Sequence, residues 1–460
     1  MLFVSDTTIT APPRGGTVLL VAAGAAFLAL LDTTVANLAV ADVRGDFAGA
    51  SVSAATWLIT IYAVVFAALL APAGRVADVV GRRALLLAGV TAFTFFSLAC
   101  ALAPSLEALL VSRALQGAAA AAMIPASLAV VLADAPPERR ARAIGLWSAA
   151  GALAAAAGPA LGGILVDTVG WRALFLVNVP VGIAIVAGTR FVPRSPGRRG
   201  RLPDAAGTLL LGAGIAAAAL GISQGPDWGW SDARTLSALI GAVVAVALAL
   251  WRSTRHPVPA IETALWRSRP FATANLASLL YGAALFPSML VGVLFLIAAW
   301  GYSPLEAGLA MTPGALVAAV VALRAGPVVA RRGPWAVIAG GALVLVAAWL
   351  LCVVALPEQP RFLVFWLPIG VLIGVGAGAV TTGVSTAAAL SVPPERFAAA
   401  VGLNQTGRQI GGALGVAVLA ALLAGSAPGV AAFADVYLFC TLASVAVVVT
   451  ALWLIAKEKR

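Results

Sequence analysis

The sequence alternates between long apolar runs and short polar segments that hold most of its charged residues. A helix of about 20 apolar residues is long enough to cross the hydrocarbon layer of a membrane, so each run predicts one spanning helix. The fourteen predicted helices cover residues 17–40, 54–73, 84–104, 108–133, 143–166, 171–191, 205–224, 235–251, 270–299, 305–329, 335–356, 362–390, 397–424 and 432–456. The pattern therefore predicts an all-α integral membrane protein with fourteen transmembrane helices.

The basic residues test this division, because Lys and Arg are enriched in the cytoplasmic loops of membrane proteins. If the N-terminus is cytoplasmic, 24 of the 29 basic residues fall on the cytoplasmic side, with Arg324 and Arg408 counted among them. Arg113 remains inside the membrane, and the residues on the outer side are Arg44, Arg172, Arg234 and Arg361. An odd number of helices would break this pattern, so both termini are predicted to be cytoplasmic.

Composition agrees with a membrane protein. Hydrophobic residues make up 62% of the chain and charged residues 10%, with a mean hydropathy of +1.03, whereas a soluble protein of 460 residues needs more polar surface. The net charge of +11 does not indicate a nucleic-acid partner, because the basic residues stand singly between apolar runs. They indicate topology and contacts with anionic lipid. The three cysteines lie inside apolar runs, so neither disulfides nor a metal site is expected.

Several classes of enzyme are excluded by what the chain lacks. Its only lysines are Lys457 and Lys459, so it has no P-loop for ATP hydrolysis. Its one histidine, His256, lies in a polar segment, which excludes a Ser-His-Asp site in the membrane. We expect no enzymatic activity, no catalytic residue and no cofactor. A signal peptide is not expected either, because the apolar run before Ala41 is too long and contains Asp32.

The stretch from Gly74 to Arg83 concentrates charge between two apolar runs, and we predict that it is a very short loop between two helices. Gly74 and Gly81 permit close approach of backbone and helices. Asp78 is expected near the start of the following helix, where free N–H groups and the helix dipole favour a carboxylate. Arg82 and Arg83 are expected to hold the loop on the cytoplasmic side.

The spacing G-x-x-x-D-x-x-G-R-R in this stretch resembles the signature loop of the major facilitator superfamily of transporters, which joins the second and third helices of the fold. Val79 departs from the family, which usually has a basic residue there. The resemblance implies that Gly74, Asp78, Gly81, Arg82 and Arg83 take part in the conformational cycle.

The resemblance also implies two related six-helix halves. A weak internal repeat agrees, because Gly326 and Gly333 have the spacing of Gly74 and Gly81 and again follow the second helix of a group. The acid of the first copy is replaced by Ala330. The expected organisation is an N-terminal tail over 1–16, an N-terminal half over 17–191, linkers and an inserted helix pair over 192–269, a C-terminal half over 270–456, and a C-terminal tail over 457–460.

Two ionisable residues lie deep inside the first six predicted helices. Asp32 is in the first helix and Arg113 in the fourth, and both are expected about 8–10 Å inside the outer boundary of the membrane. An ionisable group in hydrocarbon costs several kcal/mol unless it is paired or faces water, so a functional site is the default interpretation. A purely structural ion pair is the alternative.

Further motifs resemble the fourteen-helix drug:proton antiporters of the same superfamily. These are L-D-x-T-x-x-N around Asp32, R-x-x-Q-G at Arg113, and the segments around Asn178-Val-Pro180 and Gly402 to Gly412. The resemblance implies that Asp32 and Arg113 couple transport to protons. A helix-5 motif typical of exporters comprises Gly158, Pro159, Gly162 and Gly163, with Ala154 in place of its first glycine. Ordinary packing of small residues is the alternative for that motif.

A substrate cavity is expected between the helices of the two halves. The candidates for its lining are Asn37, Tyr62, Gln116, Asn275, Tyr281, Phe286, Asn404 and Gln405. No deeply placed acid occurs in the predicted helices 9 to 13, where Glu306 and Glu358 lie near outer ends, and Asp435 in the last helix is peripheral.

These observations and the resemblance predict a monomeric antiporter of the inner membrane. It would export amphipathic small molecules, such as antibiotics or hydrophobic cations, in exchange for protons, and its partners would be the substrate, protons and the bilayer. Two alternatives remain open at this point, a dedicated exporter of one endogenous metabolite and a membrane sensor that does not transport.

Overall fold

The computed structural model describes residues 15–47, 52–194, 197, 203–425 and 429–458. Within these ranges the regular structure is entirely helical. Fourteen helical segments of the described chain are long and apolar enough to cross a membrane, as predicted. The first six spans comprise α1 (Gly15–Val35), α3 (Val52–Val80), α4 (Arg82–Ala101), α5 (Leu106–Asp134), α6 (Arg140–Val169), and α7 (Ala173–Leu176) with α8 (Asn178–Gly188). The seventh and eighth spans are α9 (Ala205–Trp228) and α10 (Ala233–Arg255).

The last six spans comprise α11 (Arg269–Ala298), α12 (Pro304–Arg332), α13 (Pro334–Ala355), α14 (Leu367–Leu390), α15 (Phe397–Gly425) and α16 (Val430–Glu458). A π-helical turn, η5 (Phe362–Trp366), precedes α14. After α1 the chain continues through a 3₁₀ turn, η1 (Ala36–Ala39), into a short helix, α2 (Val40–Asp46).

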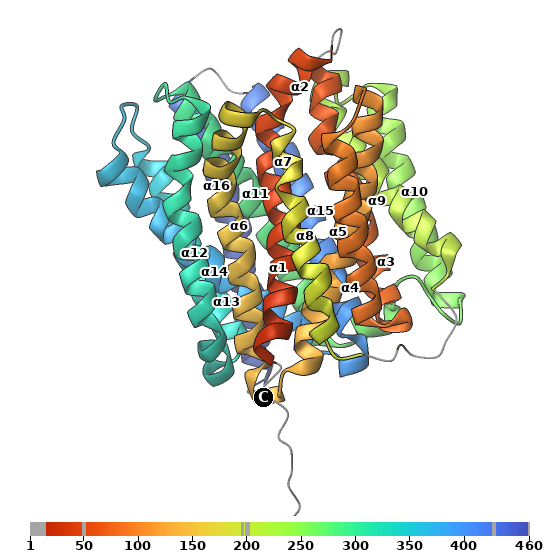
Figure 1. Ribbon diagram of the computed structural model, residues 1–460. Coiled ribbons are helices and arrows are strands. Elements are labelled where there is room, and N and C mark those ends of the chain that lie inside the picture. The colour runs from red at the N-terminus through yellow and green to blue at the C-terminus, as the bar shows by residue number, and fades with distance from the viewer. Residues whose placement is uncertain (1–14, 48–51, 195–196, 198–202, 426–428, 459–460) are drawn as a thin grey trace, which may run out of the picture.

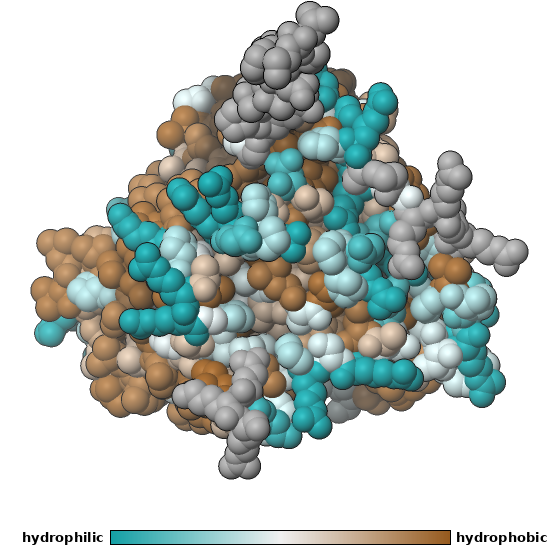
Figure 2. Space-filling model, turned by 90° about the horizontal axis from the view of Figure 1, so that it is seen from below, coloured by the Kyte–Doolittle hydropathy of each residue, from teal (hydrophilic) through white to brown (hydrophobic). Residues whose placement is uncertain are grey.

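The bundle has one end at which α1 begins and α16 ends, which we call the termini end, and an opposite far end (Figure 1). Figure 2 shows the termini end, where hydrophilic side chains spread over the face and hydrophobic ones lie around its rim. One basic residue departs from the predicted distribution. Arg408 does not belong to an end of the bundle, because it lies well inside α15, three turns past its first residue, Phe397.

The first and last six spans meet along two helix pairs, α6 with α12 and α3 with α15, and we call this contact surface the seam. Small residues bring these backbones together. A Cβ added at Gly326 of α12 would lie 2.6 Å from the carbonyl oxygen of Ala141, and one at Gly145 of α6 would lie 2.5 Å from that of Ala322. The seam therefore depends on residues that have little or no side chain.

The inserted helices α9 and α10 pack on each other, and α9 also contacts both α3 and α15 (Figure 1). Leu211 and Ile215 of α9 share an apolar cluster with Ala67 and Ala71 of α3. At the termini end, Arg252 of α10 forms an ion pair with Asp204, which precedes α9. Hydrogen bonding from Arg252 lowers the pKa of Asp204. The inserted pair thus covers one edge of the seam.

The stretch from Gly74 to Arg83 differs from its prediction as a loop. Helix α3 continues through Val80, and the chain leaves helical geometry only at Gly81, whose φ is 112°. Glycine alone adopts such a conformation without strain. Asp78 therefore lies in the last turn of α3 and not at the start of α4, and Arg82 is the first residue of α4.

The close approach at Gly326 gives a test of the seam. Gly326→Leu should destabilise the purified protein by about 1–3 kcal/mol, because the added side chain would push the α6 backbone away from α12. The matched control is Gly340→Leu on α13, where an added Cβ meets nothing within 4 Å. The measurement is the melting temperature in detergent. An equal effect of the two substitutions would contradict this account of the seam.

Candidate functional site

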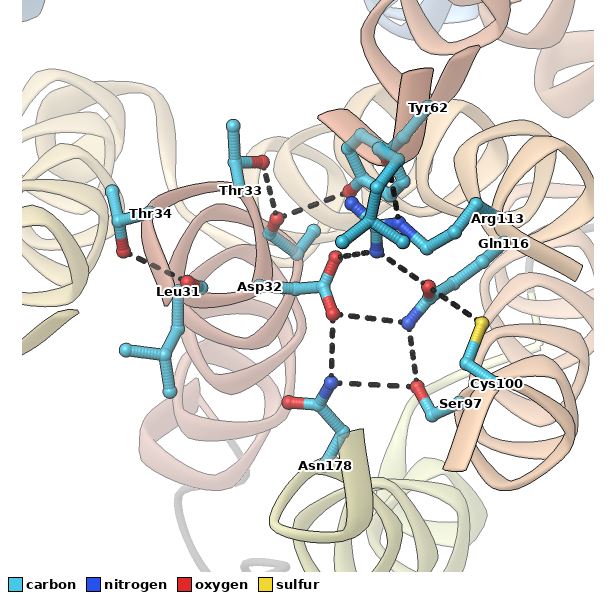
Figure 3. A network of polar contacts seen from close by, with 12 residues as sticks. Leu31, Asp32, Thr33, Thr34, Tyr62, Ser97, Cys100, Arg113, Gln116 and Asn178 are labelled. Carbon is cyan, nitrogen blue, oxygen red and sulfur yellow. Dashed lines mark hydrogen bonds and ion pairs between the residues drawn. The ribbon is translucent and has the colours of Figure 1, made fainter. Parts of the chain in front are cut away.

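A buried ion pair lies among the first six spans. Oδ2 of Asp32 on α1 is 2.5 Å from Nη1 of Arg113 on α5 (Figure 3). Asp32 is 0% exposed and Arg113 is 1% exposed, so both charges have left water completely. Burial of this kind is tolerated only where the charges are paired and their remaining hydrogen-bonding capacity is satisfied.

Two amide side chains complete the surroundings of the carboxylate (Figure 3). Nε2 of Gln116 donates to Oδ1 of Asp32 at 3.1 Å, and Nδ2 of Asn178 on α8 donates to the same oxygen at 2.9 Å. Gln116 also accepts from Arg113 at 2.7 Å and donates to Ser97 of α4 at 2.7 Å. Asp32 therefore accepts hydrogen bonds from three different side chains, which satisfies it as an anion.

The guanidinium of Arg113 is held from the other side by α3. Its Nε donates to the carbonyl oxygen of Leu58 at 3.1 Å, and its Cζ lies 4.3 Å from the centre of the Tyr62 ring. The hydroxyl of Tyr62 donates to the carbonyl oxygen of Ala29 on α1. Phe175 of α7 contacts the same cation at 5.4 Å. Helices α1, α3, α4, α5, α7 and α8 thus converge on one pair of charges.

Sequence reasoning did not place Asn178 or Ser97 in this site. Asn178 carried a signal, since it is a polar residue inside an apolar run, but the sequence does not show which helix it faces. Ser97 carried none, because a serine inside a membrane helix can bond to its own backbone. One atom of the site has no partner among the described residues, the buried Oδ1 of Asn178.

A second polar cluster lies at the termini end, where α3 meets α15. Asp78 accepts from the backbone N–H of Ala399 at 2.9 Å and that of Ala398 at 3.4 Å. These two N–H groups are in the first turn of α15, where the helix itself offers no acceptor. The expected carboxylate at a helix start therefore exists, but the helix is α15 and not α4.

Arg82 links the same two regions. It donates to Asp78 at 2.9 Å and also to the carbonyl oxygen of Pro394, just before α15. Its guanidinium lies 5.6 Å from the ring of Phe397. Gly74 allows this contact, because a Cβ there would lie 2.3 Å from the carbonyl oxygen of Ala398. Arg83 follows in α4 and is partly exposed.

Glu262 adds a contact that sequence reasoning missed. It lies in the segment after α10, and its carboxylate is 2.5 Å from Arg75 of α3 and 3.2 Å from Arg396, which precedes α15. Glu262 is 7% exposed. One carboxylate from the inserted segment thus bridges a cation of the first six spans and a cation of the last six. Its position in a polar stretch gave no signal of this partner set.

The exporter motif expected in the fifth spanning helix lies on α6, where it packs against two neighbouring helices. A Cβ added at Gly158 would lie 2.1 Å from Oγ1 of Thr34 on α1, and one at Gly163 would lie 3.0 Å from Leu305 of α12. Pro159 packs near Gly308 of α12, and Gly162 is buried. These residues therefore occupy helix contacts toward the far end of the bundle.

The candidate cavity residues fall into two groups. Tyr62 and Gln116 belong to the Asp32 network. Five others are on α11 and α15, which pack against each other. Tyr281 is buried, and its hydroxyl lies 3.1 Å from the carbonyl oxygen of Ala377. Asn404 donates to Ser278 at 2.7 Å, and Asn275 donates to the carbonyl oxygen of Phe271.

Three further cavity candidates are Phe286, Gln405 and Asn37. The ring of Phe286 lies beside Gly412, where an added Cβ would be 2.6 Å from it. Gln405 is buried, and its Oε1 has no hydrogen-bond partner among the described atoms. The side chain of Asn37 lies outside the described residues.

Comparisons with known proteins agree with the sequence patterns. A family model described as Major Facilitator Superfamily matches residues 22–416 and 276–460. The "Multidrug resistance protein Stp" of Mycobacterium tuberculosis is 34% identical over 400 residues, which cover 86% of this chain and 74% of that protein. The "Tetracenomycin C resistance and export protein" of Streptomyces glaucescens is 34% identical over 413 residues, 89% of this chain and 76% of that protein.

One more relative and one solved structure are also similar to this chain. The "Puromycin resistance protein pur8" of Streptomyces alboniger is 35% identical over 418 residues, 88% of this chain and 81% of that protein. The crystal structure of the human organic anion transporter MFSD10 superposes with a TM-score of 0.64, at 18% identity, and covers 94% of this chain and 100% of that chain. At this identity the likeness concerns the fold alone.

The contacts of Asp78 lead to a test. Asp78→Asn removes a charge that both Arg82 and the start of α15 stabilise, so the termini end should separate more often. Spin labels on Arg139→Cys and Arg331→Cys, with the native cysteines replaced by serine, report this separation. We expect a larger fraction of long distances by pulsed electron paramagnetic resonance.

The control for this test is Asp134→Asn, near the same end, since the structure gives Asp134 no ion pair or hydrogen bond with another described side chain. It should leave the distances unchanged. Unchanged distances in Asp78→Asn as well would show that this carboxylate does not hold the termini end together.

Proposed function

The chain belongs to the Major Facilitator Superfamily of membrane transporters, and from that premise we propose that it is a proton-coupled antiporter. It exports amphipathic small molecules, such as antibiotics, by alternating access. The observation that carries the proton coupling is the fully buried pair of Asp32 and Arg113. The names of the relatives, which refer to multidrug resistance and to export of single antibiotics, support the substrate class.

In this proposal Asp32 is the proton carrier. In the described state it accepts three hydrogen bonds and is closed to water, an arrangement that suits the charged carboxylate. A protonated carboxyl needs an acceptor, and rotation of the Asn178 amide would offer its unpartnered Oδ1. Protonation also removes the counter-charge of Arg113, which then repositions. A proton shifts the equilibrium between two states only through this difference in its surroundings.

The cluster at the termini end is proposed to close the cytoplasmic side. The contacts of Asp78 with α15 and of Glu262 with Arg75 and Arg396 hold the first and last six spans together there. They must break when the protein opens to the cytoplasm. The units that move would be the N-terminal half over 17–191 and the C-terminal half over 270–456, with 192–269 as the inserted part.

The proposal includes the setting of the protein. It acts as a monomer in the cytoplasmic membrane, with both termini in the cytoplasm, and takes up its substrate from that side. The distribution of basic residues supports this orientation.

A dedicated exporter of one endogenous metabolite is the second candidate. The relative named for the resistance and export of tetracenomycin C favours it, since that name refers to a single compound. The two candidates share one mechanism and differ in breadth.

The experiment that tests the proposal is transport in proteoliposomes with an imposed pH gradient and a panel of compounds. Accumulation of many unrelated compounds supports the broad exporter, and accumulation of one supports the dedicated exporter. No accumulation of any compound, together with unchanged metabolites in intact cells that lack the protein, would refute both.

Asp32→Asn should abolish proton-driven accumulation of the substrate, because the side chain can no longer take up a proton. The substrate should still bind, because Asn has nearly the size of Asp. Removing one member of a buried ion pair costs about 3–5 kcal/mol, so folding is checked by thermal unfolding. The decisive measurement is proton release from the purified protein on addition of substrate. Wild-type release from Asp32→Asn would place the carrier elsewhere.

The matched control for Asp32→Asn is Asp435→Asn, which alters an exposed carboxylate on α16 and should leave transport unchanged. Arg113→Ala should flatten the pH dependence of transport, because the cation no longer distinguishes the two protonation states of Asp32.

Orientation has its own test. A reporter that is active only in the cytoplasm, fused after Arg460, should be active, and the same reporter inserted between Asp232 and Ala233, before α10, should be inactive. The reason is the enrichment of Arg in cytoplasmic segments. Activity at the second position and not at the first would reverse the proposed orientation.

A further inference from the structure

Arg408 is a cation inside the bundle that the proposed mechanism does not use. It lies eleven residues beyond Phe397, the first residue of α15, which places it about 16 Å along the helix. The structure gives its guanidinium no ion pair and no hydrogen bond with any described residue. An intramembrane charge is costly, and one without a structural partner indicates a functional role.

The direction of this side chain follows from its helix. Leu414 of α15 is 44% exposed and marks the outer side, and Arg408 is roughly 120° away around the helix. Arg408 lies on the side of Asn404, one turn earlier, which bonds to Ser278 of α11. A Cβ at Gly282 of α11 would lie 2.1 Å from the carbonyl oxygen of Arg408, so the two backbones touch here. Arg408 is nevertheless partly exposed.

Two side-chain oxygens without hydrogen-bond partners belong to residues at nearby positions of α15 and α11. Gln405, three residues earlier on α15, is 6% exposed, and its Oε1 has no partner. Asn275 on α11, opposite Gly407, is 3% exposed, and its Oδ1 has none either. Buried polar groups are normally paired, so an unpaired set of this kind suits a bound molecule.

The charge around Arg408 is not balanced by the protein. Asp32 is already paired with Arg113 in the first six spans. In the last six spans, the acids whose side chains the structure describes are all exposed, and they are Glu306, Glu358, Glu395 and Asp435. The described interior therefore carries one uncompensated positive charge. This distribution disfavours a cationic substrate at this level, contrary to the hydrophobic cations expected from the sequence.

We propose that Arg408 is the substrate-recognition residue of the last six spans, and that it binds an acidic group of the exported molecule. The substrate class is an amphipathic aromatic acid, whose carboxylate or phenolate pairs with the guanidinium and whose neighbouring hydroxyl or N–H donates to Gln405. A planar guanidinium suits such oxygens because it can donate two parallel hydrogen bonds. A lipid headgroup is a poor source for this anion at about 16 Å from the helix start. This inference rests on the proposed export function.

The test uses matched triplets of compounds. On naphthalene, biphenyl and anthracene scaffolds, the carboxylic acid is compared with its primary amide and with the corresponding methylamine. Binding to the purified protein in nanodiscs is measured by equilibrium dialysis at pH 7.5. The acid should bind about tenfold or more tightly than its neutral and cationic counterparts, as expected for a charge-assisted hydrogen bond.

Variants separate recognition from structure. Arg408→Gln should remove the preference for acids without lowering the melting temperature, since it removes an uncompensated charge, and Arg408→Lys should keep part of the preference. Arg324→Gln, which alters an exposed arginine on α12, is the matched control and should behave as wild type.

The outcomes distinguish this inference from the proposed function. If the protein transports neutral or cationic compounds against a gradient but shows no preference for acids, or if Arg408→Gln keeps that preference, the inference is wrong and the export function stands. If no compound of either panel is transported under a pH gradient, the export function itself fails.

Discussion

The burial of Asp32 and Arg113 is the constraint around which the first six spans are arranged. Two opposite charges with at most 1% exposure are stable only when their geometry is good and further hydrogen bonds satisfy the charged groups. Here α4, α5 and α8 supply amide or hydroxyl groups, α3 supplies a carbonyl oxygen and an aromatic ring, and α1 supplies the carboxylate. None of these helices can shift without leaving a charge or an amide unsatisfied, so the pair sets their mutual register.

The last six spans lack an equivalent pair among their described residues, and their packing depends on small side chains instead. Glycines of α15 approach α11 so closely that a Cβ at Gly411 or Gly415 would lie within 2.3 Å of an α11 carbonyl oxygen. The seam with the first six spans has the same character at Gly145 and Gly326. Contacts between small residues are close but hold few side chains in place, which suits surfaces that separate and re-form. Among the described residues, hydrogen bonds of Asp78 and Arg82 and ion pairs of Glu262 add directional contacts at the termini end of the seam.

Local chemistry in the sequence predicted the helices well and the partners poorly. Each spanning helix follows from a run of about twenty apolar residues, so the count of fourteen was confirmed. The prediction of a loop at residues 74–83 was wrong. Helix α3 continues through Val80, and Gly81 alone is enough to end it. Asp78 was expected at a helix start, and it does bind one, but on a helix more than 300 residues away. Contacts of Glu262, Ser97 and Asn178 depend on how helices rotate against one another, which hydrophobic runs do not specify.

Helix α3 connects the two polar clusters physically. The carbonyl oxygen of Leu58 and the ring of Tyr62 hold Arg113, while Arg75 and Asp78, at the other end of the same helix, hold the termini end of the seam. Tyr62 and Asp78 are sixteen residues apart, about 24 Å along one continuous helix. Pro72 lies between the two contact regions of this helix. A helix with discrete contacts at both ends is the kind of element through which two sites can bias one equilibrium. Loss of the charge on Asp32 would free Arg113 from its partner and change what α3 contacts at one end. At the other end of α3, the seam contacts of Asp78 and Arg75 would then be re-formed or released.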